Sequence, residues 1–421
     1  MKNLFTIEGS PENKIAFYHL AAFIILLPFD RFYSELILIS LLLHSLIHIN
    51  RLRARSILSF QNLVLCSMFL LTLAGMIGSA DKAQAMRDLQ RQLAILLFPV
   101  IFSVLDPDLR RYRAKLLTIL AVTCIITILY LYADATRVLL YYKLPLRSLF
   151  SPAFINHNFS EPIGLHATYF SMYIALSLAV LFYFLWQEKN NTYRFLYLTG
   201  ICILLAGLVQ LASRSVLVTT MILIIPGVSF FMLRGGQRVR FAGVWLIVLG
   251  IAVLGIAKMD SFRKRYVENL KNDLTQASIN NEVLEPRIIR WHYVIKLIDQ
   301  SPVFGHGSGS EKRLLKEIYF ENRLYNSYLH ELNAHNQYLS ILLKTGISGL
   351  AVFILTLFYG FVNAWRRKDI ILAAFMVLIS VVSFSENILD VNKGIFFYAF
   401  FFGSLTGGLK SRRASTHKPV A

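Results

Sequence analysis

Residues 324–350 read LYNSYLHELNAHNQYLSILLKTGISGL. The first half is rich in Asn, Tyr and His, and it passes directly into an apolar helix expected to begin near Gln337. The apolar run 337–363 is long enough to cross the hydrocarbon core of a membrane, which takes about 20 residues. His335 and Asn336 are therefore expected at the mouth of a membrane-spanning helix.

The composition of the chain is that of a membrane protein. Of its 421 residues, 56% are hydrophobic and 13% aromatic, and the mean hydropathy is +0.55. These values are too apolar for a soluble globular domain. The sequence predicts an all-α integral membrane protein with about 12 transmembrane helices. The apolar runs cover residues 14–29, 32–50, 58–79, 90–105, 116–134, 164–186, 195–212, 216–233, 241–257, 337–363, 370–384 and 395–409.

Basic residues gather in alternate connections between these runs. Examples are RLRARS (51–56), DLRRYRAK (108–115), RGGQRVR (234–240) and WRRKD (365–369). By the positive-inside rule, these connections and both termini face the cytoplasm. Membrane topology therefore accounts for the net charge of +19 without a nucleic-acid partner.

The connections predicted on the opposite side differ in length. The longer one, residues 258–336, contains amphipathic stretches such as RKRYVENLKNDL (263–274), with apolar residues at helical spacing. A loop of this length with its own structure is more often functional than a linker. The predicted organisation is residues 1–257 with nine transmembrane helices, 258–336 as a helical cap, and 337–421 with three more helices and a cytoplasmic tail.

His335 is the first candidate for chemistry. It lies just before a helix, where backbone N–H groups are unpaired and the positive end of the helix dipole disfavours an imidazolium. A neutral imidazole can accept a proton, so the position suits a general base. The alternative is that His335 or Asn333 merely caps the helix, or that the ring sits at the lipid interface.

Three arginines are candidates for binding a phosphate. Arg214 lies between Ser213 and Ser215 in a tight turn flanked by apolar runs, where it either snorkels to headgroups or binds phosphate with its planar fork. Arg287 and Arg290 are three residues apart and share one helix face. Two guanidiniums on one face suit a diphosphate, although ion pairing on the cap surface is the commoner fate.

The sequence gives no sign of a metal or nucleotide cofactor. No cluster of carboxylates or histidines has a convincing metal-ligand spacing, and no Gly-rich phosphate loop is present. Metal-independent chemistry without a cofactor is therefore predicted.

Three motifs in this order resemble the O-antigen ligase and polymerase superfamily. They are Ser213-Arg214, then Arg287 to Trp291 followed by PVFGHG (302–307), then HNQYL (335–339) followed by GISG (346–349). Each motif alone is weak, whereas the ordered set is reasonably specific and lies within residues 210–350.

The resemblance implies a GT-C-like glycosyltransferase of the bacterial inner membrane with its active site facing the periplasm. The donor would be a glycan on undecaprenyl diphosphate, and the acceptor of an O-antigen ligase would be lipid A–core. Carried over by position, Arg214 and Arg287 would bind the donor diphosphate, and His335 would activate the acceptor hydroxyl. Possible supporting residues are Arg290, Ser213, Asn336, Tyr338, His166, Arg87 and Arg91, with a helix cap favoured for His166.

Three other functions remain open from the sequence. An O-antigen polymerase would use the same donor with a second lipid-linked repeat as acceptor. A protein O-oligosaccharyltransferase is a further relative, although such chains tend to be longer. A transporter of lipid-linked sugars would carry charges and broken helices at the membrane midplane. In the predicted spans the charges cluster at the outer edge instead, apart from Lys344, which argues against transport.

Overall fold

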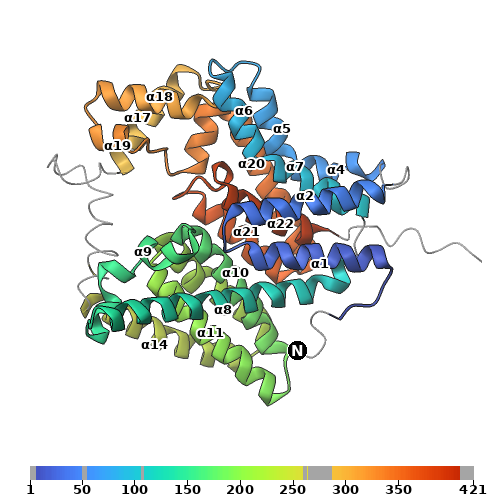
Figure 1. Cartoon of the computed structure of the whole chain (residues 1–421), viewed down its shortest axis with the longest axis vertical. Helices are drawn as coiled ribbons and strands as arrows, with labels where there is room; N and C mark the ends of the chain where they lie inside the picture. The colour runs from blue at the N-terminus through green and yellow to red at the C-terminus, as the bar shows by residue number, and fades with distance from the viewer. Residues whose placement is uncertain (1–5, 50–54, 106–108, 259–262, 264–286, 408–421) are drawn as a thin grey trace, which may run out of the picture.

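The computed structural model describes residues 6–49, 55–105, 109–258, 263 and 287–407. All regular elements in these ranges are helical (Figure 1), so the all-α prediction is confirmed. Most of the amphipathic stretch predicted at residues 263–274, and the tail after residue 407, lie outside the described residues.

Six helices in the described part of the chain are long and apolar enough to cross a membrane. The chain is therefore a multi-pass helical membrane protein. Among the other predicted runs, 241–257 lies in the 23-residue helix Gly236–Lys258, and the rest lie in helices of 17 residues or fewer. The count of about 12 therefore stays a prediction. The six helices are Lys82–Leu105, Arg111–Tyr141, Ala167–Gln187, Asn191–Leu211, Arg214–Met232 and Gln337–Arg367.

The N-terminal helices begin where polar side chains cap them. Ser10 accepts a hydrogen bond from the backbone of Asn13 at the start of α1, and Asp30 accepts one from Phe32 at the start of α2. A short turn connects α1 and α2, and the two helices pack against each other. The elements in this part are α1 (Pro11–Leu26), α2 (Arg31–Ile47), η1 (Arg55–Leu58), α4 (Phe60–Leu65), α5 (Ser67–Gly75), α6 (Lys82–Arg91), α7 (Leu93–Leu105), α8 (Leu109–Tyr141), η2 (Leu146–Phe150), η3 (Pro152–Phe154), α9 (His157–Ser160) and η4 (Glu161–Ile163).

Helix α10 (Ala167–Gln187) lies at the centre of the bundle. Its apolar stretch is 89% buried, compared with 56% or less for the other five long helices. It packs against α8 and against several helices that follow it in the chain. These include α11 (Asn191–Leu211), α12 (Arg214–Val218) and α13 (Ile225–Met232), with the π-helical turn η5 (Thr219–Ile224) between the last two and α14 (Gly236–Lys258) after them.

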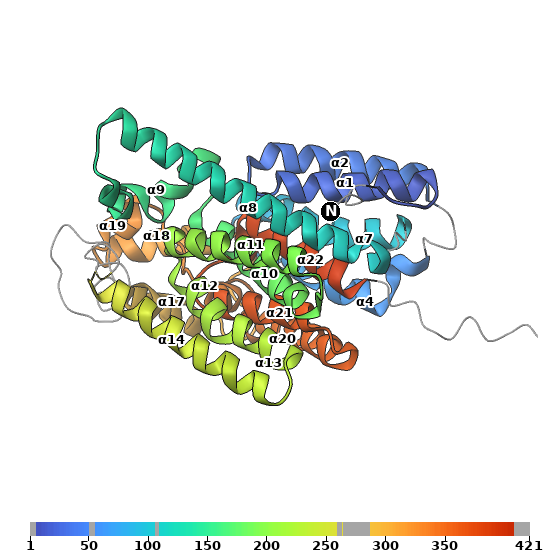
Figure 2. The same cartoon turned by 90° about the horizontal axis from the view of Figure 1, so that it is seen from below.

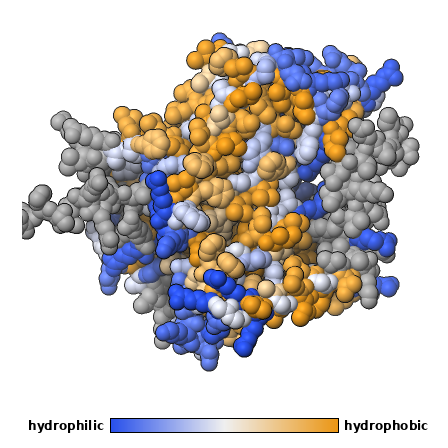
Figure 3. Space-filling model, turned by 180° about the vertical axis from the view of Figure 1, so that it is seen from behind, coloured by the Kyte–Doolittle hydropathy of each residue, from blue (hydrophilic) through white to orange (hydrophobic). Residues whose placement is uncertain are grey.

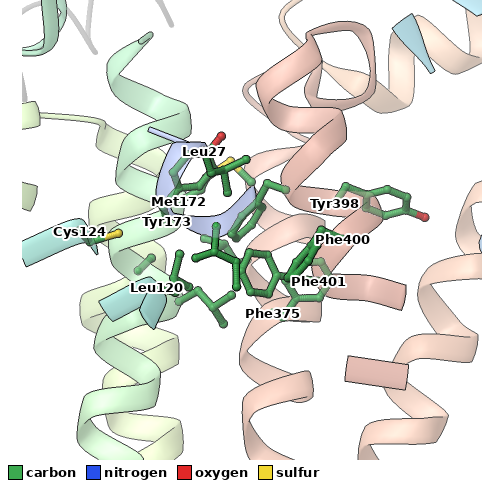
Figure 4. Packing of buried hydrophobic residues seen from close by; sticks show 14 of the residues in the cluster. Leu27, Leu120, Cys124, Met172, Tyr173, Phe375, Tyr398, Phe400 and Phe401 are labelled. Atoms are coloured by element: carbon green, nitrogen blue, oxygen red, sulfur yellow. The ribbon is translucent and has the colours of Figure 1, made fainter. Parts of the chain in front are cut away.

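Aromatic side chains fill the core beside α10 (Figure 4). Tyr173 of α10 packs at 5.0 Å between ring centroids against Phe397. Phe375 packs against Phe401 and Phe397. The outer surface is also apolar: Figure 3 shows a broad hydrophobic face with hydrophilic side chains gathered toward its edges, as expected for helices that contact lipid.

The C-terminal part of the chain adds a compact group of helices beside the bundle. These helices, α17 to α19, enclose a small apolar cluster that includes Val294, Leu315 and Tyr319, and Leu343 of α20 also joins it. We call residues 287–329 the α17–α19 group. The elements here are α17 (Arg287–Gln300), α18 (Ser310–Glu321), α19 (Tyr325–Leu329), α20 (Gln337–Arg367), α21 (Ile370–Val382), η7 (Ile388–Asp390) and α22 (Asn392–Thr406).

Helix α20 begins at Gln337, as predicted, but it is broken at Gly346. Gly346 has φ 65° and ψ −164°, a conformation essentially confined to glycine. The PVFGHG loop (302–307) enters the break and pairs with the freed backbone groups. His306 and Gly307 donate to the carbonyls of Leu343 and Lys344, while Ile347 and Ser348 donate to those of Pro302 and Val303. Neighbouring backbone thus satisfies the broken helix.

The glycines of the two motifs allow this close approach. A β-carbon at Gly305 would overlap the backbone of Lys344 and Thr345, and one at Gly346 would overlap the carbonyl of Val303. The same loop is tied to α5, because the Ser308 N–H donates to the carbonyl of Gly75 at 3.0 Å. Two weak sequence motifs therefore form a single junction that fixes the α17–α19 group on the bundle.

Candidate functional site

His335 lies immediately before α20 but does not cap it. Asn336 is the capping residue, because its Oδ1 accepts from the N–H groups of Tyr338 at 3.0 Å and Leu339 at 3.2 Å. His335 adopts a φ of 46°, which a non-glycine residue rarely does. Its N–H donates to Oδ1 of Asn333 at 2.9 Å. The imidazole is therefore left for contacts other than capping.

The imidazole of His335 faces a buried carboxylate from the C-terminal part of the chain. Its Nδ1 lies 3.5 Å from Oε2 of Glu386, and the Glu386 side chain is 12% exposed. Burial raises the pKa of the Glu386 carboxyl. The hydrogen bond and charge of His335, together with the charges of His166 and Arg287, outweigh burial and leave the pKa of Glu386 below its usual value. Glu386 is therefore an anion near neutral pH.

Arg287 joins this pair from the start of α17. Its Nη1 donates to the carbonyl of Ser385 at 3.1 Å, and its Nη2 lies 4.0 Å from Oε1 of Glu386. The side chain is 26% exposed. Arg287 and His335, which are 48 positions apart in the sequence, are thus brought to the same carboxylate.

Arg290 has a different environment from Arg287, although both lie on α17. It is 5% exposed, and its Nη1 donates to the carbonyl of Asn333 at 3.3 Å. The indole N–H of Trp291 donates to the next carbonyl, that of Ala334, at 2.8 Å. Arg290 and Trp291 therefore hold the segment that leads into His335.

The N-terminus of α10 reaches the same carboxylate. The hydroxyl of Thr168 donates to Oε1 of Glu386 at 3.5 Å. His166 caps α10, with Nδ1 accepting from the Thr168 N–H at 3.4 Å. His157 accepts from the Ala167 N–H at 3.3 Å, and its ring centroid lies 4.0 Å from that of His166. Sequence reasoning considered His166 and missed His157.

Arg214 begins α12, directly after Ser213, which is buried. The preceding residue, Ala212, ends α11 with a left-handed φ of 47°. Helix α12 packs against α10 and against α21, which precedes Glu386. The loop before α10 also docks nearby, since the Asn156 N–H donates to the carbonyl of Gln210 at 3.1 Å. Arg214 thus lies on an element that packs against both α10 and α21.

The other predicted supporting residues contact different parts of the structure. The Tyr338 hydroxyl donates to the carbonyl of Ser380 at 2.9 Å, so this ring links α20 to α21. Arg87 donates to Gln84 at 3.0 Å, and Arg91 pairs with Asp88 at 3.2 Å. Both arginines are exposed on α6, which packs against the turn at the start of α18.

A buried polar network behind His335 was not anticipated as part of the site. Glu311 of α18 and Asp390 both bind Lys344, at 3.0 and 2.8 Å. Asn387 connects this network to the peptide of Asn336. Glu311 looks in the sequence like an ordinary first-turn acid of an amphipathic helix, so only tertiary structure identifies it. Among the described residues, no group of three or more His, Cys, Asp or Glu side chains is arranged to hold a metal ion.

Figures 1 and 2 place α9 and the α17–α19 group toward the same side of the molecule. His335 and Arg287 contact Glu386, and the charge of His166 also acts on it. The fold and this cluster define a multi-pass helical membrane protein with a cationic, histidine-containing site at helix ends.

Residues 200–354 match the protein family described as O-Antigen ligase. This segment contains all three sequence motifs, and the resemblance to the O-antigen ligase and polymerase superfamily is confirmed. The chain is also 24% identical over 190 residues to an uncharacterized protein of Haemophilus influenzae. That match covers 42% of this chain and 47% of the relative, so it spans about half of the relative's length.

Proposed function

We propose that the protein is an O-antigen ligase that transfers a glycan from undecaprenyl diphosphate to a hydroxyl of lipid A–core. The observation that carries the proposal is the convergence of His335 and Arg287, both within the segment that matches the family, on the carboxylate of Glu386. The α17–α19 group beside this site is the feature that favours a ligase over an O-antigen polymerase. A protein O-oligosaccharyltransferase is less well supported, because such chains tend to be longer. A lipid-linked sugar transporter is also less well supported: α20 is broken beside Lys344, but Lys344 is paired with Glu311 and Asp390 and the PVFGHG loop satisfies the break.

The arginines have the chemistry needed for the leaving group. When the glycosyl–oxygen bond breaks, its electron pair passes to the diphosphate, which leaves with increased negative charge. Planar guanidiniums aimed at those oxygens stabilise the developing charge and can take the place of a metal ion. Arg287 and Arg214 would bind the diphosphate, and the Thr168 end of α10 would add the positive end of a helix dipole.

The His335–Glu386 pair has the chemistry needed for the acceptor. If Nδ1–H of His335 donates to the Glu386 carboxylate, Nε2 carries the lone pair and can remove a proton. The acceptor oxygen then attacks the anomeric carbon as its proton passes to Nε2, while the bond to the diphosphate breaks on the opposite side. A single displacement of this kind inverts the anomeric configuration.

The proposal includes an orientation and a location. The chain would lie in the bacterial inner membrane with about 12 spans and both termini in the cytoplasm. The α17–α19 group would belong to a periplasmic cap, so that the site meets the lipid-linked donor at the bilayer surface and the acceptor from the periplasm. The basic connections between the predicted spans support this orientation.

Glycan transfer by the purified protein tests the function. Wild type, His335→Ala and His330→Ala would be supplied with an undecaprenyl-diphosphate glycan and lipid A–core in excess EDTA. His330 is an exposed histidine five positions away and serves as the matched control. We expect transfer by wild type and His330→Ala, and a loss of about 100- to 10,000-fold in His335→Ala, the range for a general base.

The products separate the alternatives. Lengthening of the lipid-linked glycan without transfer to lipid A–core would identify a polymerase. Full activity of His335→Ala would reject His335 as the base. Wild-type transfer that is absent in EDTA but present in a parallel reaction with added divalent cation would reject metal-independent chemistry.

A further inference from the structure

Glu311 contacts both chain segments that carry the His335–Glu386 pair. It is the second residue of α18 and is 5% exposed. Its Oε1 accepts from the Ala334 N–H at 3.1 Å and from Nδ2 of Asn387 at 3.3 Å. Ala334 directly precedes His335, and Asn387 directly follows Glu386. One carboxylate oxygen therefore joins the two backbone segments from which the pair projects.

The second oxygen of Glu311 is held by the first turns of α20. Ser340 donates a hydrogen bond to Oε2, and Nζ of Lys344 lies 3.0 Å from it. Ser340 and Lys344 are four residues apart and therefore share one helix face. A buried carboxylate persists only when it is paired and hydrogen-bonded. Lys344 supplies that pairing, so the contacts with α20 fix the position of the Glu311 carboxylate.

Asn387 extends the same connection to the start of α20. Its Oδ1 accepts from the Asn336 N–H at 2.8 Å, and its Nδ2 also donates to Asp390 at 3.0 Å. The backbone N–H groups on the two sides of His335 thus donate to Glu311 and to its partner Asn387. This arrangement opposes the relaxation expected of a non-glycine residue held at a left-handed φ of 46°.

We infer that Glu311 is a positioning residue that aligns the His335 imidazole with the Glu386 carboxylate. It acts through the backbone of Ala334 and the side chain of Asn387, and it does not touch the substrates. This role rests on the proposed function of His335 as the base. It also assigns a task to the α17–α19 group, because α18 supplies the residue that sets the geometry of the pair.

Steady-state kinetics of Glu311→Gln provide the main test. The glutamine side chain has the same size, but one of the two carboxylate oxygens becomes an NH₂ group. An NH₂ group donates hydrogen bonds, so it cannot accept those that this oxygen of Glu311 accepts. We expect kcat to fall about 100-fold, as for a misplacement of about 1 Å at a reacting group. The KM values for donor and acceptor should change by less than about 2-fold. Glu317→Gln is the matched control, because Glu317 lies on the same helix with a 53% exposed side chain.

Glu311→Asp separates alignment from charge compensation. Aspartate keeps the negative charge that Lys344 requires, which protects folding if the Gln variant is unstable. Because its side chain is one methylene shorter, it cannot meet Ala334, Asn387 and Lys344 together, so kcat should fall here too. Full activity in Glu311→Asp would assign Glu311 to charge compensation alone and overturn the inference, as would loss of the folded protein in both variants.

A measurement without substrates keeps this test distinct from the proposed function. Modification of His335 by diethyl pyrocarbonate can be followed by mass spectrometry, with His330 as the internal reference. We expect the rate at His335, relative to His330, to change at least about 3-fold in Glu311→Gln and not in Glu317→Gln. If wild type proves inactive but this rate changes, the proposed function fails while the alignment by Glu311 stands. An unchanged rate overturns the alignment.

Discussion

At the scale of single residues, the site depends on a division of tasks between neighbours. Asn336 caps α20 and Asn333 accepts the N–H of His335, so the imidazole is not used by its own helix. Arg287 and Arg290, which are three positions apart, also have different tasks. Arg287 is partly exposed beside Glu386, and Arg290 is buried against the carbonyl of Asn333.

Acidification should reveal the coupling between His335 and Glu386. The pKa of Glu386 is lowered despite burial, and His335 is the largest of the opposing causes. A carboxyl whose pKa is lower in the folded protein than the ordinary value of 4.5 stabilises the fold at pH values above 4.5. This stabilisation is lost as the pH falls through the folded pKa. His335→Ala removes the partner, so its melting temperature should lie about 2 °C below that of wild type at about pH 6.

This difference should shrink as the pH is lowered from about 6 through the folded pKa of Glu386, because the carboxyl is then protonated in both proteins. Thermal unfolding in detergent, followed by intrinsic fluorescence, measures it, with His330→Ala as the reference variant. A difference that stays constant across this range would contradict the coupling.

Replacement of Arg287 and Arg290 should give opposite results. Arg287→Ala removes a guanidinium that we place on the leaving diphosphate, so kcat/KM should fall about 100- to 1,000-fold. The loss of stability should be smaller than in Arg290→Ala, because Arg287 is partly exposed. Arg290→Ala leaves a buried carbonyl without its donor and should cost about 1–3 kcal/mol of stability. Transfer rates and unfolding curves for both variants decide the matter, and equal effects on both would contradict the assignment.

At the scale of elements, the break in α20 explains two motifs that seem unrelated in the sequence. PVFGHG and GISG are both glycine-containing, and the sequence places them 40 or so residues apart. In the structure the PVFGHG loop packs into the helix break at the GISG motif, and four backbone hydrogen bonds join the two segments. The helix segment that carries Lys344 is thereby fixed relative to the α17–α19 group.

Gly346→Ala should disrupt this junction. The alanine β-carbon would overlap the Val303 carbonyl, and φ 65° with ψ −164° is accessible essentially only to glycine. We expect a loss of about 2–3 kcal/mol in stability, because both strain and overlap oppose folding. Gly250→Ala in α14 is the matched control, since nothing lies within 4 Å of a β-carbon there. Unfolding of the two purified variants makes the comparison, and equal stability would show that the junction tolerates a side chain.

At the scale of the whole molecule, hydropathy was sufficient to predict the class of fold. Apolar runs of bilayer length mark helices by composition alone, and the start of α20 at Gln337 followed from the change in polarity before it. The ordered motifs also predicted the match of residues 200–354 to the O-antigen ligase family. Periodicity could not reveal the break at Gly346, because an apolar run continues across it. Nor could it pair His335 with Glu386, since that contact depends on how α20 and the segment after α21 pack.

The orientation of the whole molecule is open to direct measurement by cysteine accessibility. The predicted topology puts Tyr142 and Glu317 on the periplasmic side and Lys189 on the cytoplasmic side, and all three are exposed. Single substitutions to cysteine at these positions would be treated with a membrane-impermeant thiol reagent in spheroplasts. The unsubstituted chain is the blank, because it contains Cys66, Cys124 and Cys202.

We expect Tyr142→Cys and Glu317→Cys to react in intact spheroplasts, and Lys189→Cys only after permeabilisation. Basic residues held in the cytoplasm are the physical reason for this orientation, and the proposed chemistry requires it, since donor and acceptor meet outside. Reaction of Lys189→Cys in intact spheroplasts would contradict the predicted topology. Reaction of Tyr142→Cys without Glu317→Cys would place the α17–α19 group on the wrong side of the membrane for a periplasmic acceptor. Either pattern would remove the ligase proposal together with the roles given to His335 and Arg287.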